Sequence, residues 1–178
     1  MSRPSYLFGY GSLVSLQSAE CTLRRNLNPS QIDDAVLPDY SRSWTAIIPV
    51  IAGSVNEPIL ASFLDLRKEP GAECNGVVIE VSAEELEAMD HREKGYERER
   101  LEVLTSRGAV DAWTYIFRMT GRSDFVLKGY LEIVTTAVAS RSEKFQRDFW
   151  ASTDAAPSRV VSGAYRFTDA KQNEVTGR

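Results

Sequence analysis

Two short stretches of the sequence hold residues that could bind or transform a small molecule. The first is a loop in which two glycines flank a tyrosine, and its residues are Phe8, Gly9, Tyr10, Gly11, Ser12 and Leu13. Glycine permits positive φ and a close approach of the backbone to a ligand. Successive amide N–H groups in such a turn can converge on a carboxylate or phosphate, especially where a helix begins nearby. The loop therefore indicates an anion-binding cradle, although two glycines would also let the chain turn sharply without any ligand.

This loop does not match the other glycine motifs of known chemistry. It has no lysine of the kind that a phosphate-binding P-loop needs, and Val14 stands where a G-x-G-x-x-G motif has its third glycine. It also lacks the G-x-S-x-G pattern of a nucleophile elbow. Ser12 is therefore expected to form hydrogen bonds rather than to act as a nucleophile.

The second stretch is Met89–Tyr96, in which Glu93 falls at the end of a predicted helix. The negative end of the helix dipole disfavours a carboxylate at that place and raises its pKa, as burial would. Arg92 and Lys94 flank Glu93 and would lower its pKa if both pointed toward it. A carboxyl with a raised pKa suits general acid–base chemistry near neutral pH, so Glu93 is the candidate catalytic residue. The alternative is a solvated run of charges without a catalytic role.

The helix that carries Glu93 has the clearest boundaries in the sequence. Ser82 and Glu85 form a capping box, in which each side chain satisfies a backbone amide of the other residue. An apolar stripe at helical spacing follows, and Gly95 is a natural stop in the left-handed conformation. These signals predict a helix over residues 83–93.

Runs of β-branched and aromatic residues predict strands around this helix. The predicted strands are Tyr6–Tyr10, Ser43–Ile51, Ile59–Leu66, Gly76–Val81, Arg98–Thr105 and Val110–Met119, the last with Trp113, Tyr115, Phe117 and Met119 on one face. Turn residues predict a turn at Lys68–Gly71. Further helices are expected within Ser12–Asn26 with Ser18 as N-cap, at Tyr130–Ala139, and at Glu143–Trp150 with Ser142 as cap. Strands in runs with a few helices between them predict an α+β fold with a curled or barrel-like sheet.

Composition and charge narrow the class of protein. The chain has 178 residues, 43% of them hydrophobic and 26% charged, which fits a single domain over residues 1–178 with a core of about 5–150 and a polar C-terminal extension. A net charge of −4 lacks the basic footprint of a nucleic-acid-binding protein. Apolar runs such as Trp44–Ala52 fall short of the ~20 residues that span a membrane, and Met1–Pro4 lacks the apolar core of a signal peptide. A cytoplasmic protein with a small-molecule partner is therefore expected.

The two stretches together resemble the γ-glutamylcyclotransferase-like superfamily, which includes ChaC-type glutathione-specific enzymes, γ-glutamylamine cyclotransferases and AIG2-like proteins. In these families a Y-G-S-L or Y-G-S-N loop opens the domain, and a catalytic glutamate lies in an L-D-x-x-E segment followed by Y-x-R. The resemblance places the substrate loop on residues 8–13 and the catalytic glutamate on Glu93, with Tyr96 and Arg98 as the trailing pair. Tyr130 resembles a tyrosine that begins a late helix and lines the pocket.

The resemblance covers about residues 5–150 and implies a compact mixed β-barrel flanked by helices, with no metal and no organic cofactor. It implies cyclisation of a γ-glutamyl amide or peptide to 5-oxoproline with release of an amine or amino acid, as in glutathione metabolism. The reaction is of the transferase or lyase type. The subfamily, the particular substrate and the oligomeric state stay open.

Two other classes of function remain as alternatives. The same barrel could bind a small ligand or a protein without turnover, although a buried carboxylate would not help it to bind anions. An amide hydrolase would use Ser12 or Cys21 as the nucleophile. It would need an activating base, and His91 is the single histidine of the chain.

Overall fold

Five strands close into a barrel at the centre of the molecule. In neighbour order they are β3 (Ile59–Val81), β1 (Ser5–Gly9), β5 (Gly108–Phe117), β4 (Tyr96–Thr105) and β2 (Ile32–Ala52), and β2 pairs again with β3. The β1–β5 pairing is parallel, whereas the others in the ring are antiparallel. Three short strands extend this sheet, namely β6 (Phe125–Leu127), β7 (Arg159–Val161) and β8 (Tyr165–Phe167).

The computed structural model describes residues 4–53, 57–119 and 121–178. Met1–Arg3, part of the Met1–Pro4 stretch on which the signal-peptide expectation rests, lie outside the described residues. The helices of the described part are α1 (Leu16–Leu23), α2 (Ala83–Arg92), α3 (Lys128–Ala139), α4 (Glu143–Ala151) and α5 (Ala170–Thr176), with 3-10 turns η1 (Ser12–Val14) and η2 (Pro29–Gln31). The α+β class and the mixed barrel flanked by helices, both predicted from the sequence, are confirmed.

Strands β2 and β3 form one long hairpin, and this corrects the predicted turn at Lys68–Gly71. Those residues lie inside β3, where the register with β2 shifts between Pro38 and Tyr40. Gly71 has a φ of +83°, and its N–H donates a hydrogen bond to Oδ1 of Asp39 over 2.8 Å. The turn-forming residues thus make a β-bulge, which bends a strand without ending it.

Helix α2 begins and ends close to its predicted bounds. Nitrogen of Glu85 donates to Oγ of Ser82 over 3.2 Å, and nitrogen of Ser82 donates to Oε2 of Glu85 over 2.8 Å, so the capping box is confirmed. Gly95 follows with a φ of +94°. The cap of α4 by Ser142 is also confirmed, since its Oγ accepts from nitrogen of Phe145 over 3.2 Å.

The N-cap predicted for α1 is wrong by three residues. The capping residue is Ser15, whose side chain accepts from nitrogen of Ser18. A serine at either place could have served, and the 3-10 turn η1, which ends at Val14, makes Ser15 the residue that precedes the helix. The side chain of Ser18 instead accepts a hydrogen bond from an arginine of α2.

The hairpin β4–β5 confirms the two strands predicted at Arg98–Thr105 and Val110–Met119, apart from the ends. Tyr115 and Phe117 are buried, as their shared face predicts. Met119 lies beyond β5 and is 81% exposed, so its predicted place on that face is wrong. The strand ends at Phe117, and the alternation of faces ends with it.

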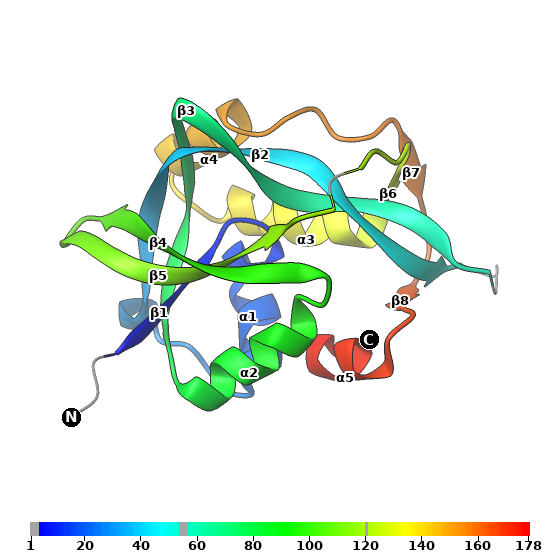
Figure 1. The fold of residues 1–178 in the computed structure, drawn as a ribbon, viewed down its shortest axis with the longest axis horizontal. Helices are drawn as coiled ribbons and strands as arrows, with labels where there is room; N and C mark the ends of the chain where they lie inside the picture. Colours follow the sequence, from blue (N-terminus) through cyan, green and yellow to red (C-terminus); the bar gives the residue numbers. More distant parts are fainter. Residues whose placement is uncertain (1–3, 54–56, 120) are drawn as a thin grey trace.

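The residues after α4 return to the barrel. Strand β8 pairs with the end of β2, and β7 pairs with β6. Helices α1, α2 and α5 contact one another and lie together below the barrel in the view of Figure 1. The predicted polar extension therefore contains a strand, β8, and a helix, α5, that contact the core. The assignment of the whole chain to one domain stays a prediction.

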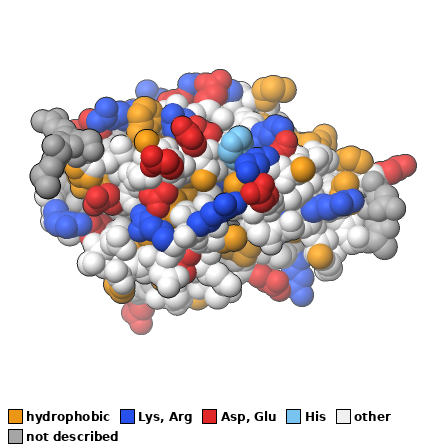
Figure 2. Space-filling view, turned by 90° about the horizontal axis from the view of Figure 1, so that it is seen from below, with side chains coloured by type: hydrophobic (Ala, Val, Ile, Leu, Met, Phe, Trp, Pro, Cys, Tyr) orange, Lys and Arg blue, Asp and Glu red, His pale blue; other side chains and the backbone are white. Residues whose placement is uncertain are grey.

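The surface shows the mixed charge expected from the composition. Acidic and basic side chains are interspersed over the face seen in Figure 2. Among the described residues, no helix is both long and apolar enough to cross a membrane.

Candidate functional site

One pocket brings together all the residues that the sequence predicts for the site. It encloses about 700 Å³, counted with the space at its open mouth. Its walls include the loop after β1, the end of α2, the first part of β3, the start of α3 and the residues from β8 onward. The lining residues predicted from the sequence are Phe8, Gly9, Tyr10, Gly11, Ser12, Leu13, Glu93 and Tyr130.

The two loop glycines are required by close packing, and neither has a positive φ. A Cβ on Gly9 would lie 2.6 Å from Cβ of Leu13, and a Cβ on Gly11 would lie 3.1 Å from Oη of Tyr130. A side chain at either position would therefore push the loop away from its neighbours. Of the two reasons for glycine given by the sequence, close approach of the backbone therefore applies here and positive φ does not.

The loop rests on a buried arginine. Nε of Arg42 donates to the carbonyl oxygen of Tyr10 over 2.7 Å, and the side chain of Arg42 is completely buried. The hydroxyl of Tyr10 donates to the carbonyl oxygen of Tyr115 over 2.6 Å. The backbone carbonyl and the side-chain hydroxyl of Tyr10 are thus each fixed by a hydrogen bond, and these bonds hold the middle of the loop in place.

Glu93 occupies the C-cap position of α2, and its side chain is 19% exposed. Burial raises the pKa of the Glu93 carboxyl, and the neighbouring Arg92 partly opposes this rise. A raised pKa agrees with the prediction from the sequence, and its main cause is burial of the carboxyl. A carboxyl of this kind can exchange a proton nearer to neutral pH than an exposed glutamate can.

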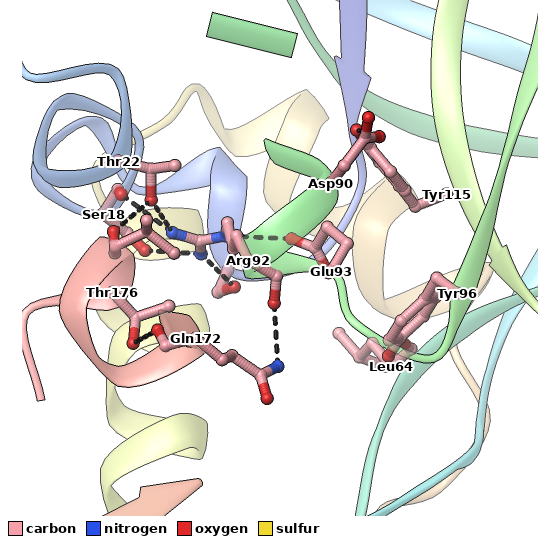
Figure 3. A network of polar contacts seen from close by, with 12 residues as sticks. Ser18, Thr22, Leu64, Asp90, Arg92, Glu93, Tyr96, Tyr115, Gln172 and Thr176 are labelled. Carbon is pink, nitrogen blue, oxygen red and sulfur yellow. Dashed lines mark hydrogen bonds and ion pairs between the residues drawn. The ribbon is translucent and has the colours of Figure 1, made fainter. Parts of the chain in front are cut away.

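Arg92 connects Glu93 with the glycine loop and α1 (Figure 3). Its Nε donates to Oε1 of Glu93 over 2.9 Å, and one Nη2 bond reaches Oγ of Ser12, also over 2.9 Å. The other three bonds go to the carbonyl oxygen of Ser18, to Oγ of Ser18 and to Oγ1 of Thr22. A guanidinium has five N–H donors, so this buried side chain is fully used.

Lys94 does not pair with Glu93, although the two are neighbours in the sequence. Its ammonium pairs with the carboxylate of Asp169, just before α5. Of the two cations that flank Glu93 in the chain, only Arg92 pairs with the Glu93 carboxylate. The rise in the pKa of Glu93 is accordingly opposed by the charge of Arg92 and not by that of Lys94.

Four tyrosines, Tyr10, Tyr96, Tyr115 and Tyr130, lie near the carboxylate, and the hydroxyl of each forms a hydrogen bond, that of Tyr10 as described above. Oη of Tyr96 donates to the carbonyl oxygen of Leu64 over 3.0 Å, and Oη of Tyr130 accepts from nitrogen of Leu64 over 3.4 Å. Tyr115 donates to Oδ1 of Asp90 over 2.7 Å. Burial raises the pKa of each of these phenols, so they stay neutral at physiological pH.

Several lining residues were not predicted from the sequence, because they come from a segment that reads as a polar tail. They are Tyr165, Phe167, Gln172, Thr176 and Arg178. Nε2 of Gln172 donates to the carbonyl oxygen of Arg92 over 2.8 Å, which ties α5 to the end of α2. The signal in the sequence that points to this wall is the aromatic pair Tyr165 and Phe167 within an otherwise polar segment.

The residues of the hydrolase alternative are not brought together. Oγ of Ser12 faces Arg92, which is a cation and cannot accept its proton. His91 lines a separate hollow with Thr22 and Lys171, and Cys21 is exposed on α1. Within the described ranges, no group of three or more His, Cys, Asp or Glu side chains could hold a metal ion.

Solved structures identify the class of fold. A protein described as a γ-glutamyl cyclotransferase has a TM-score of 0.64 at 15% identity, over 99% of this chain and 100% of that chain. YkqA from Bacillus subtilis has a TM-score of 0.63 at 18% identity, over 84% of this chain and 54% of YkqA, so this chain spans about half of its length. A yeast γ-glutamyl cyclotransferase specific to glutathione has a TM-score of 0.55 at 13% identity, over 85% and 98%. The fold is that of γ-glutamyl cyclotransferases.

The sequence identifies the family. The family model described as γ-glutamyl cyclotransferase, AIG2-like, matches residues 7–131, a range that includes the glycine loop, Glu93 and Tyr130. The chain belongs to this family, and the resemblance found in the sequence is confirmed. No curated protein sequence matches the chain.

Proposed function

We propose that this protein cyclises a γ-glutamyl amide or peptide to 5-oxoproline, with Glu93 as the proton-transfer residue. The observation that carries the proposal is a single glutamate, with a pKa raised by burial, in a pocket that also contains the glycine loop. Membership of the family supports an enzyme of the γ-glutamyl cyclotransferase class. The substrate and the cytoplasmic location are part of the proposal.

The reaction is an intramolecular aminolysis that needs no water. The α-amine nitrogen of the substrate forms a bond to the γ-carbonyl carbon, and the bond from that carbon to the leaving nitrogen breaks. The α-ammonium nitrogen loses two protons in becoming the lactam N–H, and the departing nitrogen gains two in leaving as an ammonium ion. Because the nucleophile and the carbonyl belong to one molecule, the protein mainly has to hold a ring-closing conformation.

One carboxylate can perform both proton transfers if it lies between the two nitrogens. Glu93 passes one of these protons from the attacking nitrogen to the leaving nitrogen, and the second is exchanged with solvent as the free amine becomes an ammonium ion. The bond from Nε of Arg92 holds Oε1 of Glu93 in place. The second oxygen, Oε2, has no hydrogen bond to a described residue and is the one proposed to move the proton.

The glycine loop is proposed to bind the substrate's α-carboxylate or the oxygen that becomes negative during ring closure. The first amide N–H groups of a helical turn have no partner within that turn, and η1 begins at Ser12. Because Oγ of Ser12 accepts its hydrogen bond from Arg92, its own hydrogen is free to be donated to a ligand. Tyr10, within the loop, and Tyr130, on α3, shape the pocket.

The test is release of 5-oxoproline by the purified protein from glutathione, simple γ-glutamyl-amino acids and γ-glutamyl-ε-lysine. We expect turnover of at least one of these compounds. A folded protein that is silent across the panel would contradict the proposal. Ligand binding without turnover would instead support the binding-module alternative, in which the same pocket only holds a small acidic ligand.

A further inference from the structure

The pocket has two arginines, and only one of them is already committed to protein partners. All five N–H groups of Arg92 donate to described residues. The guanidinium of Arg178, which follows α5, forms no hydrogen bond or ion pair with any residue in the described ranges. Arg178 also lines the pocket and is solvent-accessible. The pocket therefore contains a cation that is free to bind a ligand.

The guanidinium of Arg178 is nevertheless held in position by stacking. Its Cζ lies 3.9 Å from the centre of the Tyr165 ring and 5.8 Å from the centre of the Phe167 ring. Stacking uses the face of a guanidinium and leaves the N–H groups on its edge, which are the groups that bind a carboxylate in a bidentate way. Burial lowers the pKa of the Arg178 guanidinium from its ordinary, strongly basic value.

A second, independent observation lies next to Arg178. The side chain of Tyr165 lines the pocket and is 8% exposed, and its buried Oη has no hydrogen-bond partner among the described residues. A buried hydroxyl without a partner destabilises the folded protein, so a bound acceptor at this place would remove that destabilisation. Burial raises the pKa of Tyr165 to about 12, so the phenol is a neutral donor.

These two residues belong to a different wall from the proposed reaction centre. Glu93 comes from the end of α2 and the glycine loop follows β1, whereas Tyr165 lies on β8 and Arg178 follows α5. Phe63 packs between the walls, with its ring centre 4.7 Å from that of Tyr130 and 6.4 Å from that of Tyr165. A substrate whose γ-amide lies at Glu93, with its α-carboxylate at the loop, would extend its amine part toward the Arg178 wall.

We propose that Arg178 and Tyr165 form a subsite for a carboxylate on the leaving amine of the γ-glutamyl substrate. This inference rests on the proposed function and narrows it to γ-glutamyl-amino acids and peptides, as opposed to γ-glutamyl derivatives of neutral or cationic amines. The guanidinium supplies the charge and paired donors, and the Tyr165 hydroxyl supplies one further donor. Arg178 acts on selectivity and not on the proton transfer.

The test compares two ligands that differ only at that group, γ-glutamyl-glycine and γ-glutamyl-glycinamide. Calorimetric binding is measured on the Glu93→Gln protein, which prevents turnover. We expect the carboxylate ligand to bind about tenfold more tightly, a difference of ~1.4 kcal/mol, as is usual for a charge-assisted contact in a partly exposed site. Arg178→Ala should reduce this preference to about twofold or less.

Two further variants separate a ligand contact from a structural one. Arg166→Ala removes a neighbouring exposed arginine on β8 and should leave the preference unchanged. Tyr165→Phe keeps the stacked ring and removes only the unpartnered hydroxyl, so it should lower the preference without lowering the free energy of unfolding.

Three outcomes would overturn the subsite. The first is an unchanged carboxylate preference in Arg178→Ala, and the second is that neither ligand binds. The third is that Arg178→Ala weakens the binding of both ligands equally, which would place Arg178 at the α-carboxylate. The proposed function is tested separately by 5-oxoproline release from the same two compounds with Glu93 present. A carboxylate preference that depends on Arg178, without any turnover, would support the subsite and contradict the proposed function.

Discussion

Nε of Arg42 donates a hydrogen bond to the carbonyl oxygen of Tyr10 over 2.7 Å, so a buried cation supports the middle of the glycine loop. Its other donors reach neutral oxygens, including Oδ1 of Asn75 over 2.9 Å and Oγ of Ser152 over 2.7 Å. Its Cζ stacks 3.7 Å from the centre of the Phe149 ring. Burial lowers the pKa of Arg42 to about 10, which still leaves it charged at neutral pH. The loop is therefore held by a positive charge that no carboxylate of the described residues neutralises by direct contact.

Replacement of Arg42 by lysine should disturb both the fold and the loop. A lysine ammonium cannot reproduce the planar fork or the stacking on Phe149. We expect Arg42→Lys to lower the free energy of unfolding by at least ~2 kcal/mol and to raise KM more than it lowers kcat. Urea unfolding and 5-oxoproline kinetics measure these effects. Arg67→Lys, at an exposed ion-paired arginine of β3, is the control and should change stability by about 1 kcal/mol or less. Equal effects of the two variants would contradict the role given to Arg42.

Gly11→Ala should disturb the pocket through a close contact with the hydroxyl of Tyr130. The added Cβ would lie 3.1 Å from Oη of Tyr130, so the loop or the ring must move. We expect Gly11→Ala to weaken substrate binding, and we expect Tyr130→Phe in the same chain to restore part of its stability. Double-mutant analysis of unfolding measures this coupling.

Gly129→Ala is the matched control for that experiment, because its Cβ would meet the Tyr165 ring at an ordinary 3.6 Å within helix α3. It should be neutral or stabilising, since alanine is the better helix former. If the effects of Gly11→Ala and Tyr130→Phe simply add, the close contact between them has no energetic consequence and the argument from packing is wrong.

Glu93→Gln should stabilise the protein near neutral pH. A carboxyl whose pKa is raised in the folded state favours folding when protonated, and that contribution is lost as the pH rises through the raised pKa. The variant should therefore unfold at higher urea concentration than the wild type at pH 7, and the difference should disappear as the pH falls to the ordinary value of 4.5. Glu87→Gln, at an exposed glutamate of the same helix, should show no such pH-dependent gain.

The acid side of the activity profile should report on the Arg92–Glu93 contact. Arg92 opposes the rise in the pKa of Glu93, so Arg92→Gln should raise that pKa further and move the acid limb of kcat/KM to higher pH. Lys94→Gln changes the other flanking cation, which pairs with Asp169, and should leave the limb in place. A shift of equal size in both variants would mean that proximity in the sequence, and not the Arg92 contact, sets the pKa.

The sequence predicted the site well where the signals are local. The capping box of Ser82 and Glu85 locates α2 and so places Glu93 at its end. The glycine loop is recognisable in the sequence by its two glycines, and the structure explains them, because a Cβ at Gly9 or Gly11 would lie too close to a neighbour. Both features depend on residues close together in the chain.

What the sequence did not predict depends on contacts between distant segments. The bulge at Lys68–Gly71 looks like a turn until β2 lies beside it, with Asp39 accepting from Gly71. The role of Arg92 as a link between α1, the loop and Glu93 appears only when these elements meet. The wall that contains Tyr165 and Arg178 follows about 70 residues after Glu93, with no spacing pattern to connect it to the loop.

The most direct measurement is 5-oxoproline release from γ-glutamyl-alanine by the wild type, Glu93→Gln and Glu87→Gln, with ligand affinity measured in parallel. The proposed mechanism predicts turnover by the wild type and by Glu87→Gln. It predicts a loss of at least about a hundredfold in kcat for Glu93→Gln, which should keep its affinity for the substrate. Near wild-type kcat in Glu93→Gln would contradict the proton-transfer role of Glu93.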